Sequence, residues 1–407
     1  MYIPRTLEAY VKKAARRMPV LLVTGARQVG KTTLLRHAAA RGRAYVTLDD
    51  PLILQLARND PALFVQRFRP PILIDEIQYA PGLLPHIKMI VDEERKPGLF
   101  WLTGSQHFHL MKGISESLAG RVGIVRLLGL SRRELLLRTP TTSPFVPSPA
   151  AIRKRMSSGG KLGLGALFDL IWRGSLPAIA TDKRTDWSLF YGSYVQTYLQ
   201  RDVRDLARVG DETAFLRFLR ATAARTAQLV NIADLARDAD VAPNTAKHWL
   251  SILEASGVVY WLEPWHANVT KRLVKTPKLY VLDTGLCAYL TGWSTARALE
   301  AGAFAGAMLE TWVVGELLKS YWHNGVDAPF YYYRDRDSKE IDLLILRDGV
   351  FHPLEIKKSA APSRDDVRSF QSLRRLGVPI GAGGVICLVA DLLPLTADTH
   401  AIPVGAL

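Results

Sequence analysis

The sequence predicts an α/β fold: a parallel-sheet domain, then a mostly helical region, then a smaller α/β unit. Three observations lead to this prediction. Short apolar runs alternate with helical patterns through the first 130 residues, which is typical of a parallel sheet covered by helices. Apolar residues then recur at helical spacing from about 164 to 300. From 301, a helical stretch precedes three β-like segments, FYYYRD, EIDLLILR and FHPLEIKK.

The elements of the first domain follow from the same patterns. Residues 7–17 predict a short amphipathic helix, PVLLVT at 19–24 predicts a buried strand, and TTLLRHAAARG predicts the helix after it. Further strands are expected at AYVTLDD, PPILIDE (70–76), GLFWLTGS (98–105) and GIVRLLGL (123–130).

Length and charge limit the class of protein. The 407 residues allow two or three domains at about 150 residues each. The net charge of +15 is uneven, because residues 1–130 carry 19 basic and 10 acidic side chains, 131–161 carry 7 and 1, and 162–407 carry 27 of each. A local basic excess favours a polyanion such as nucleic acid. Two cysteines and no long apolar stretch predict a cytoplasmic protein without a membrane segment.

We expect five segments along the chain. Residues 138–163 are rich in Pro, Ser, Thr and Gly and carry only basic charges, which predicts a mobile connector or insertion. The expected segments are a P-loop domain at 1–137, the connector at 138–163, a helical segment at 164–225, a winged helix-turn-helix unit with a basic segment at 226–300, and an α/β domain at 301–407.

The strongest motif is a complete G-x-x-x-x-G-K-T, which runs from Gly25 to Thr32 between a predicted strand and a predicted helix. The backbone N–H groups of such a loop bind phosphate at the helix N-terminus. Lys31 is expected to reach the β- and γ-phosphates of ATP, and the Thr32 hydroxyl to bind Mg²⁺. The residues expected to bind the nucleotide are Gly25, Ala26, Arg27, Gln28, Val29, Gly30, Lys31, Thr32 and Thr33.

Two adjacent carboxylates end the run ILIDE. Asp75 is expected to hold Mg²⁺ together with Thr32, and Glu76 to activate the attacking water. Alternation along a strand would point these two carboxylates in opposite directions. The hydroxyl of Ser105, which ends another apolar run, is expected to sense the γ-phosphate. Together with Lys31, these residues predict an ATPase that uses ATP and Mg²⁺.

The chain resembles prokaryotic AAA-type ATPases of the AAA_14 class, in which a C-terminal domain of unknown function, DUF4143, follows the ATPase. The similarity lies in GARQVGKTT, LDDP, DEIQ, LTGS and LAGRV, and it continues in WRGSLP, YLQRDV and KLYVLDTG. It implies an AAA-type fold and homo-oligomers, with a hexameric ring as one arrangement. Arg121 of LAGRV is then the expected arginine that stabilises the transferring phosphoryl group, in its own subunit or a neighbour's. The alternative is a helix cap or a surface ion pair.

Residues 228–264 predict two helices, a tight turn and a hairpin strand, which is the arrangement of a winged helix-turn-helix. The start of the second helix, which Asn244 would cap, is expected to contact DNA without strong base specificity, and KRLVKTPK (271–278) to contact phosphates. Winged helices also serve contacts between proteins. The candidate DNA-binding residues are Asn244, Thr245, Lys247, His248, Lys271, Arg272, Lys275 and Lys278.

The last domain resembles the PD-(D/E)xK nuclease superfamily, because Asp342 precedes Glu355-Ile-Lys357 on consecutive predicted strands. Asp342 and Glu355 would bind Mg²⁺, and Lys357 would polarise the attacking water. The resemblance adds Glu310 from the preceding helix, whereas helical geometry favours Glu316, in the middle of an apolar face. The alternatives to an active nuclease are a solvated charged hairpin and a domain that only binds DNA.

These features together predict an ATP-hydrolysing motor that acts on DNA through backbone contacts. Branched DNA, such as a Holliday junction, would suit a ring joined to a nuclease-like fold. Two alternatives stay open: a signalling or defence ATPase with a protein partner, and an ATP-gated nuclease that depends on Mg²⁺.

Overall fold

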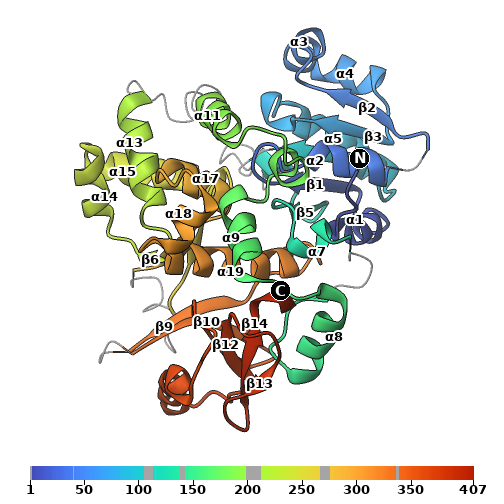
Figure 1. Ribbon diagram of the computed structural model, residues 1–407. Helices are drawn as coiled ribbons and strands as arrows, with labels where there is room; N and C mark the ends of the chain where they lie inside the picture. Colours follow the sequence, from blue (N-terminus) through green and yellow to red (C-terminus); the bar gives the residue numbers. More distant parts are fainter. Residues whose placement is uncertain are drawn as a thin grey trace.

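The computed structural model describes residues 2–39, 41–104, 113–114, 116–137, 143–198, 212–265, 276–335 and 339–407 (Figure 1). An N-terminal α/β domain, a helical middle region and a C-terminal sheet domain follow one another along the chain. Helix α19 (Ala305–Trp322) runs through the centre of the molecule, between the N-terminal domain and the C-terminal sheet (Figure 1). No described helix is both long and apolar enough to cross a membrane.

Five parallel strands form the N-terminal sheet, in the order β2-β3-β4-β1-β5. They are β1 (Val20–Thr24), β2 (Ala44–Thr47), β3 (Ile72–Asp75), β4 (Phe100–Gly104) and β5 (Val122–Arg126). Strand β1 is buried along its whole length, because Val20 and Leu22 pack into one core and Leu21 and Val23 into another. A strand covered on both faces requires an uninterrupted apolar run. The predicted α/β fold is therefore confirmed.

Helices and short turns of helix cover the two faces of this sheet (Figure 1). They are α1 (Leu7–Ala15), α2 (Lys31–Ala38), α3 (Pro51–Asn59), α4 (Pro61–Arg67), η1 (Ile77–Tyr79), α5 (Leu83–Glu94) and α7 (Arg132–Leu135). Local sequence determines several helix starts. The Asp50 carboxylate, for example, accepts from the backbone N–H groups of Leu52 and Ile53, and Pro51 occupies the first helical position.

The segment that the sequence predicts as a mobile connector or insertion contains a helix and is packed against α19 over residues 143–163. Helix α8 (Pro149–Gly159) begins after Ser148, whose hydroxyl accepts from the Ala151 N–H at 3.4 Å. Phe145 is fully buried, and its backbone bonds to the side chains of two residues of α19, Ser320 and Tyr321. These apolar and hydrogen-bonded contacts attach the segment to α19 in spite of its Pro- and Ser-rich composition.

The middle region consists of helices and a small antiparallel sheet with the order β6-β8-β7. Helix α15 begins at Pro243 after the N-cap residue Ala242, so Asn244 lies inside the helix and does not cap it as expected. The elements are α9 (Leu164–Arg173), α10 (Pro177–Thr181), α11 (Trp187–Tyr198), α13 (Glu212–Ala223), β6 (Gln228–Leu229), α14 (Ile232–Ala239), α15 (Pro243–Ala255), β7 (Val259–Leu262), β8 (Lys278–Val281), α17 (Thr284–Leu290) and α18 (Ala296–Ala301).

A buried carboxylate joins the middle region to the N-terminal domain. Asp283 accepts hydrogen bonds from the Ser175 N–H and hydroxyl, at 2.7 and 2.9 Å, and from the Tyr191 hydroxyl at 2.7 Å. The Ser175 carbonyl in turn accepts from the N–H of Leu130, which follows β5, at 2.7 Å. This chain of bonds holds the segment after α9 against the end of the N-terminal sheet.

The C-terminal domain has a six-stranded mixed sheet with the order β13-β14-β12-β11-β10-β9. Strands β9, β10 and β11 pair antiparallel, and β11, β12 and β14 pair parallel. The elements are β9 (Phe330–Arg334), β10 (Glu340–Arg347), β11 (Val350–Ile356), η3 (Arg364–Leu376), β12 (Gly383–Cys387), β13 (Leu393–Pro394), β14 (Thr399–Pro403) and η4 (Val404–Ala406). The three predicted β-like segments correspond to β9, β10 and β11.

Candidate functional site

The loop between β1 and α2 has the backbone of a phosphate-binding turn. Gly25 has φ 151°, and a Cβ there would lie 2.1 Å from the carbonyl oxygen of Leu127. Gly30, with φ 94°, stands at the N-cap of α2 in the left-handed region. Both positions therefore require glycine. The loop presents the N-terminus of α2 to the carboxyl edge of the sheet.

Lys31 lies within this loop and is 6% exposed. Its ammonium donates to the carbonyls of Gly25 and Ala26, at 2.9 Å each. These two bonds keep the Lys31 ammonium inside the turn of the loop, where an incoming phosphate would meet it.

Asp75, at the end of β3, is the centre of a hydroxyl network. Its Oδ1 accepts from Thr32 at 2.6 Å and from the Thr103 hydroxyl, and its Oδ2 accepts from Tyr45 at 3.3 Å. Asp75 and Thr103 are buried. The structure thus brings together Thr32 and Asp75, the two residues expected to hold Mg²⁺. Ser105 lies outside the described residues, and Thr103 is the hydroxyl of this strand that reaches Asp75.

Glu76 does not continue strand β3. Its backbone lies in the left-handed region, with φ 58° and ψ 47°, so the expected strand alternation with Asp75 does not apply to it. The Glu76 N–H donates to the Thr103 hydroxyl at 3.0 Å, and its carboxylate accepts from Gln78. A left-handed glutamate is costly and persists only where its surroundings impose it. Glu76 thus lies directly after Asp75, the residue expected to hold Mg²⁺.

The middle of the phosphate loop is fixed by partners from other elements. Arg27 donates to the Tyr79 hydroxyl at 3.2 Å, and Gln28 adopts φ 61°. Gln28 also lines a pocket of about 300 Å³ together with residues of α11. The Val29 carbonyl accepts from Arg5 at 2.9 Å.

Arg5 is a residue of this site that the sequence did not indicate. Besides bonding to Val29, its guanidinium donates to the carbonyls of Leu128 and Gly129, at 2.7 and 3.0 Å, and pairs with Glu134 at 3.1 Å. Arg5 is 5% exposed and Glu134 is fully buried. Burial alone would raise the pKa of Glu134, but Arg5 and His323 hold it below its usual range. No motif marks Arg5, because its partners are distant in sequence.

Replacing Arg5 by Ala is expected to lower the free energy of unfolding by about 3–5 kcal/mol, because the buried Glu134 carboxylate loses its charged partner. The matched control is Arg16→Ala, since Arg16 lies exposed just after α1, the helix that Arg5 precedes. Denaturant unfolding measures both changes. A loss for Arg5→Ala of less than about 1 kcal/mol, the value of an exposed ion pair, would contradict the buried network.

The Arg121 guanidinium donates two hydrogen bonds to the Asp92 carboxylate on the protein surface. The bond donated by Nη2 is 3.1 Å long. The register between β1 and β5 sets Val20 beside Val122 and Thr24 beside Arg126. Arg121 therefore lies at the edge where these parallel strands begin, whereas the phosphate loop leaves the edge where they end. This placement argues against a role for Arg121 at the phosphate loop of its own subunit, and its contact with Asp92 is the surface ion pair that was the alternative.

The candidate DNA-binding residues are only partly brought together. Asn244, Lys247 and His248 are exposed near the start of α15, and Thr245 is half-buried. Lys271, Arg272 and Lys275 lie outside the described residues. Lys278 is 3% exposed and is no candidate for a phosphate contact, because its ammonium is occupied inside the protein. The prediction that Lys278 contacts DNA phosphates is therefore wrong.

Lys278 lies in a carboxylate cluster that contains four of the residues expected for a nuclease-like site. The ammonium is 3.2 Å from Glu310 of α19, 2.5 Å from Glu340 and 3.7 Å from Asp342 of β10. Glu355 and Lys357, at the end of β11, are 3.5 Å apart. Burial and the neighbouring Asp342 raise the pKa of Glu355 to about 9. Burial alone would lower the pKa of Lys278, but the carboxylates raise it above its usual value.

Glu316 is not part of this cluster, so the prediction from helical geometry is wrong. Its carboxylate accepts from Lys319 at 2.8 Å and from the Arg132 N–H at 2.9 Å. The apolar face on which Glu316 lies packs toward the N-terminal domain, and these two donors satisfy the buried charge. Glu310, the residue that the resemblance indicated, is the helix carboxylate of the cluster.

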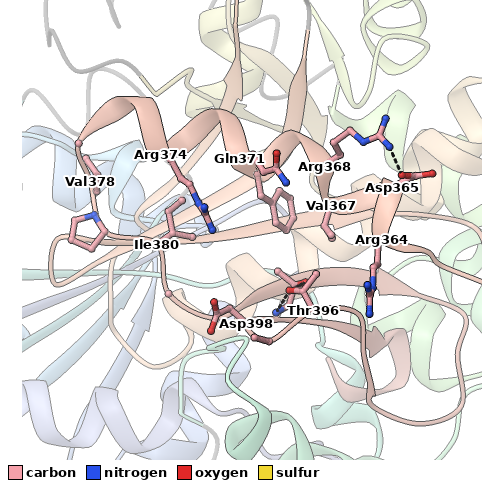
Figure 2. Close-up of a pocket in the computed structure, with 16 residues that line it drawn as sticks. Arg364, Asp365, Val367, Arg368, Gln371, Arg374, Val378, Ile380, Thr396 and Asp398 are labelled. Carbon is pink, nitrogen blue, oxygen red and sulfur yellow. Dashed lines mark hydrogen bonds and ion pairs between the residues drawn. The ribbon is translucent and has the colours of Figure 1, made fainter.

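A wide pocket of about 860 Å³ lies elsewhere on the C-terminal domain (Figure 2). Figure 2 shows Arg364, Arg368 and Arg374 of η3 along one side and Thr396 and Asp398 on the other. None of the site residues that the sequence predicts lines this pocket.

The fold and the phosphate loop define a P-loop protein of the AAA type. Family models match three segments, described as "AAA domain" (17–136), "Domain of unknown function (DUF8612)" (164–297) and "Domain of unknown function (DUF4143)" (305–407). Uncharacterized protein Rv2008c of Mycobacterium tuberculosis is 34% identical over 362 residues, 88% of this chain and 75% of that protein. Uncharacterized protein Mb2031c of Mycobacterium bovis gives the same values. The chain belongs to this family of AAA-domain proteins with a C-terminal DUF4143 domain.

Solved structures that match this chain have low sequence identity to it. The Walker-type ATPase paby2304 of Pyrococcus abyssi matches with a TM-score of 0.44 and 14% identity, over 70% of this chain and 94% of that one. A RuvB protein of Thermotoga maritima matches with a TM-score of 0.30 and 17% identity, over 62% of this chain and 86% of that one.

Proposed function

We propose that this protein hydrolyses ATP at the phosphate loop. The observation that carries the proposal is the convergence of Lys31, the Thr32–Asp75–Thr103 network and Glu76 at the carboxyl edge of one parallel sheet. In this arrangement the loop and Lys31 bind the β- and γ-phosphates, and Glu76 orients and deprotonates the attacking water.

Thr32 and Asp75 fit a Mg²⁺ ion. Their oxygens already lie 2.6 Å apart, and Mg²⁺ prefers oxygen ligands from one or two protein groups together with substrate phosphates. When bound, the ion would neutralise charge that develops on the phosphates. Asp75 and Thr32 would hold it, and Thr103 would keep the Asp75 carboxylate oriented through its hydroxyl bond.

A cavity of about 220 Å³ beside the loop is suited to the base of the nucleotide. Its lining includes Gly30 and Thr33 of the loop and α2, Tyr2 and Ile3 near the N-terminus, and Pro177 of α10 in the middle region. An apolar cavity next to a phosphate site is what a flat, largely apolar base requires. The base would then contact both the N-terminal domain and the middle region.

We further propose that the ATPase acts on DNA. The helices α14 and α15 with the pair β7–β8 have the order of a winged helix-turn-helix, and Asn244, Lys247 and His248 stand exposed on the second helix. The net positive charge of residues 1–161 supports a polyanion partner. Because Arg121 lies at the edge of the sheet away from its own loop, we propose that it serves the ATP site of a neighbouring subunit in a homo-oligomer.

The DNA proposal is tested by ATP turnover and by binding at several salt concentrations. We expect turnover to rise with at least one of duplex, junction or single-stranded DNA, and affinity to fall linearly with the logarithm of salt concentration. Lys247→Ala should reduce the steepness of that dependence by about one. Lys183→Ala, which removes an exposed lysine elsewhere, is the control. No binding to any of the three DNAs at low salt would favour the alternative, an ATPase with a protein partner.

A further inference from the structure

The carboxylate cluster of the C-terminal domain has a lysine at its centre. We infer that Lys278 takes the place of a divalent cation there, so that the cluster is an ion-paired clamp between β8 and the C-terminal domain and not a metal-dependent cleavage site. The inference stands independently of ATP hydrolysis and of DNA binding.

The first argument is the position of the ammonium. Three carboxylates, those of Glu310, Glu340 and Asp342, lie 2.5–3.7 Å from the Lys278 nitrogen, and the lysine side chain is 4% exposed. An ammonium and a metal ion compete for the same carboxylate oxygens, and two cations in one small buried site repel each other strongly. The space in which a metal would contact Glu310 and Asp342 together is the space that Lys278 holds.

The second argument is that the same carboxylates also accept hydrogen bonds from other donors. The Tyr280 hydroxyl donates at 2.7 Å to Glu310 Oε1, the oxygen that also faces Lys278, and the backbone N–H of Ile356 donates to Asp342 Oδ2 at 2.9 Å. Ser369 donates to Glu355 at 3.1 Å. Mg²⁺ demands oxygens at about 2.0–2.1 Å in near-octahedral geometry. To bind Glu310 and Asp342 together it would have to displace the Lys278 ammonium that lies beside both, so the residues present do not fit the metal.

The third argument is that Lys278 and its carboxylate partners belong to different parts of the protein. Lys278 belongs to β8 of the middle region, whereas its partners lie on α19 and β10. The same two parts are joined close by, because the Trp265 N–H donates to the Tyr332 carbonyl at 2.7 Å and the Tyr332 N–H to the Glu263 carbonyl at 3.0 Å. The Tyr332 ring also lies 5.9 Å from the Lys278 ammonium. Lys278 thus completes an interface that the backbone has already aligned.

Mn²⁺ binding to the full chain without nucleotide tests the inference. Mn²⁺ substitutes for Mg²⁺, and the free ion is measured by electron paramagnetic resonance. We expect the wild type and Asp342→Asn to bind the same number of Mn²⁺ ions. Lys278→Met should bind one additional ion, and the double variant that combines Lys278→Met with Asp342→Asn should lose that additional ion. Weaker Mn²⁺ binding by Asp342→Asn than by wild type would overturn the inference, and so would a folded Lys278→Met variant with no added ion.

The clamp is tested by thermal unfolding, which also covers the case in which Lys278→Met does not fold. Lys278→Arg keeps the charge and should retain most of the stability, whereas Lys278→Met should lower the Tm by several degrees. Equal stability of the wild type and Lys278→Met would overturn the clamp.

A third measurement is cleavage of supercoiled plasmid with Mg²⁺ or Mn²⁺. We expect none from the wild type, and cleavage that disappears in Lys357→Ala would show an active metal site.

Discussion

Lys31→Ala is expected to reduce ATP turnover by at least about a hundredfold, the loss typical of removing one group that stabilises the charge of a transition state. The variant loses the ammonium that the phosphate loop surrounds, and the Gly25 and Ala26 carbonyls lose their donor. ATP affinity should fall as well, because the same ammonium would contact the phosphates before and during the reaction. Phosphate release measures turnover, and a fluorescent ATP analogue measures affinity.

Lys12→Ala is the matched control for this change. Lys12 is half exposed and forms an ion pair with Glu8 on the surface of α1, so its removal should leave turnover and affinity unchanged. Circular dichroism should show the same fold for both variants. Turnover by pure Lys31→Ala at the rate of the wild type would mean that the loop is not the site of hydrolysis.

Local patterns predicted the N-terminal domain well. The phosphate loop occupies eight consecutive positions, and its conformation depends on residues that are neighbours in the sequence. The motif and its flanking apolar runs were therefore sufficient to predict the loop and the elements on either side of it. The strand positions followed for the same reason, since burial of both sheet faces leaves uninterrupted apolar runs. Glu76 shows the limit of such rules. Its left-handed backbone ends the strand one residue earlier than alternation assumes.

The errors have a common physical cause, which is contact between residues distant in sequence. Composition suggested a mobile connector or insertion at 138–163, but Phe145 packs into the core and a helix spans Pro149–Gly159 within that segment. Lys278 counted as one of several basic residues, although carboxylates 32 and more positions away surround it. Glu316 lies on the apolar face as expected, yet its partner is Arg132 of the N-terminal domain. The contacts of Phe145 with α19, of Lys278 with Glu310 and of Glu316 with Arg132 all join residues far apart in the sequence, and such contacts leave no local signature.

Glu76→Gln is expected to separate ATP binding from hydrolysis. The substitution conserves the shape of the side chain and the backbone bond to Thr103, so the phosphate loop and the Asp75 network should remain intact. It removes the carboxylate that would take a proton from the attacking water, a contribution of about 10²–10⁴ in rate. We therefore expect ATP affinity within about twofold of the wild type and turnover reduced by at least about a hundredfold.

The left-handed backbone at residue 76 does not complicate the comparison of Glu76→Gln with the wild type, because Gln carries the same backbone strain as Glu. The two side chains differ in charge, in proton affinity and in the exchange of one oxygen for an N–H donor. Glu94→Gln, on the surface beside Lys96, is the control for loss of one negative charge. Single-turnover hydrolysis, measured with enzyme in excess over ATP, separates the chemical step from product release. If Glu76→Gln hydrolyses bound ATP as fast as the wild type in that assay, then another group positions the water, and the left-handed turn serves only to end β3.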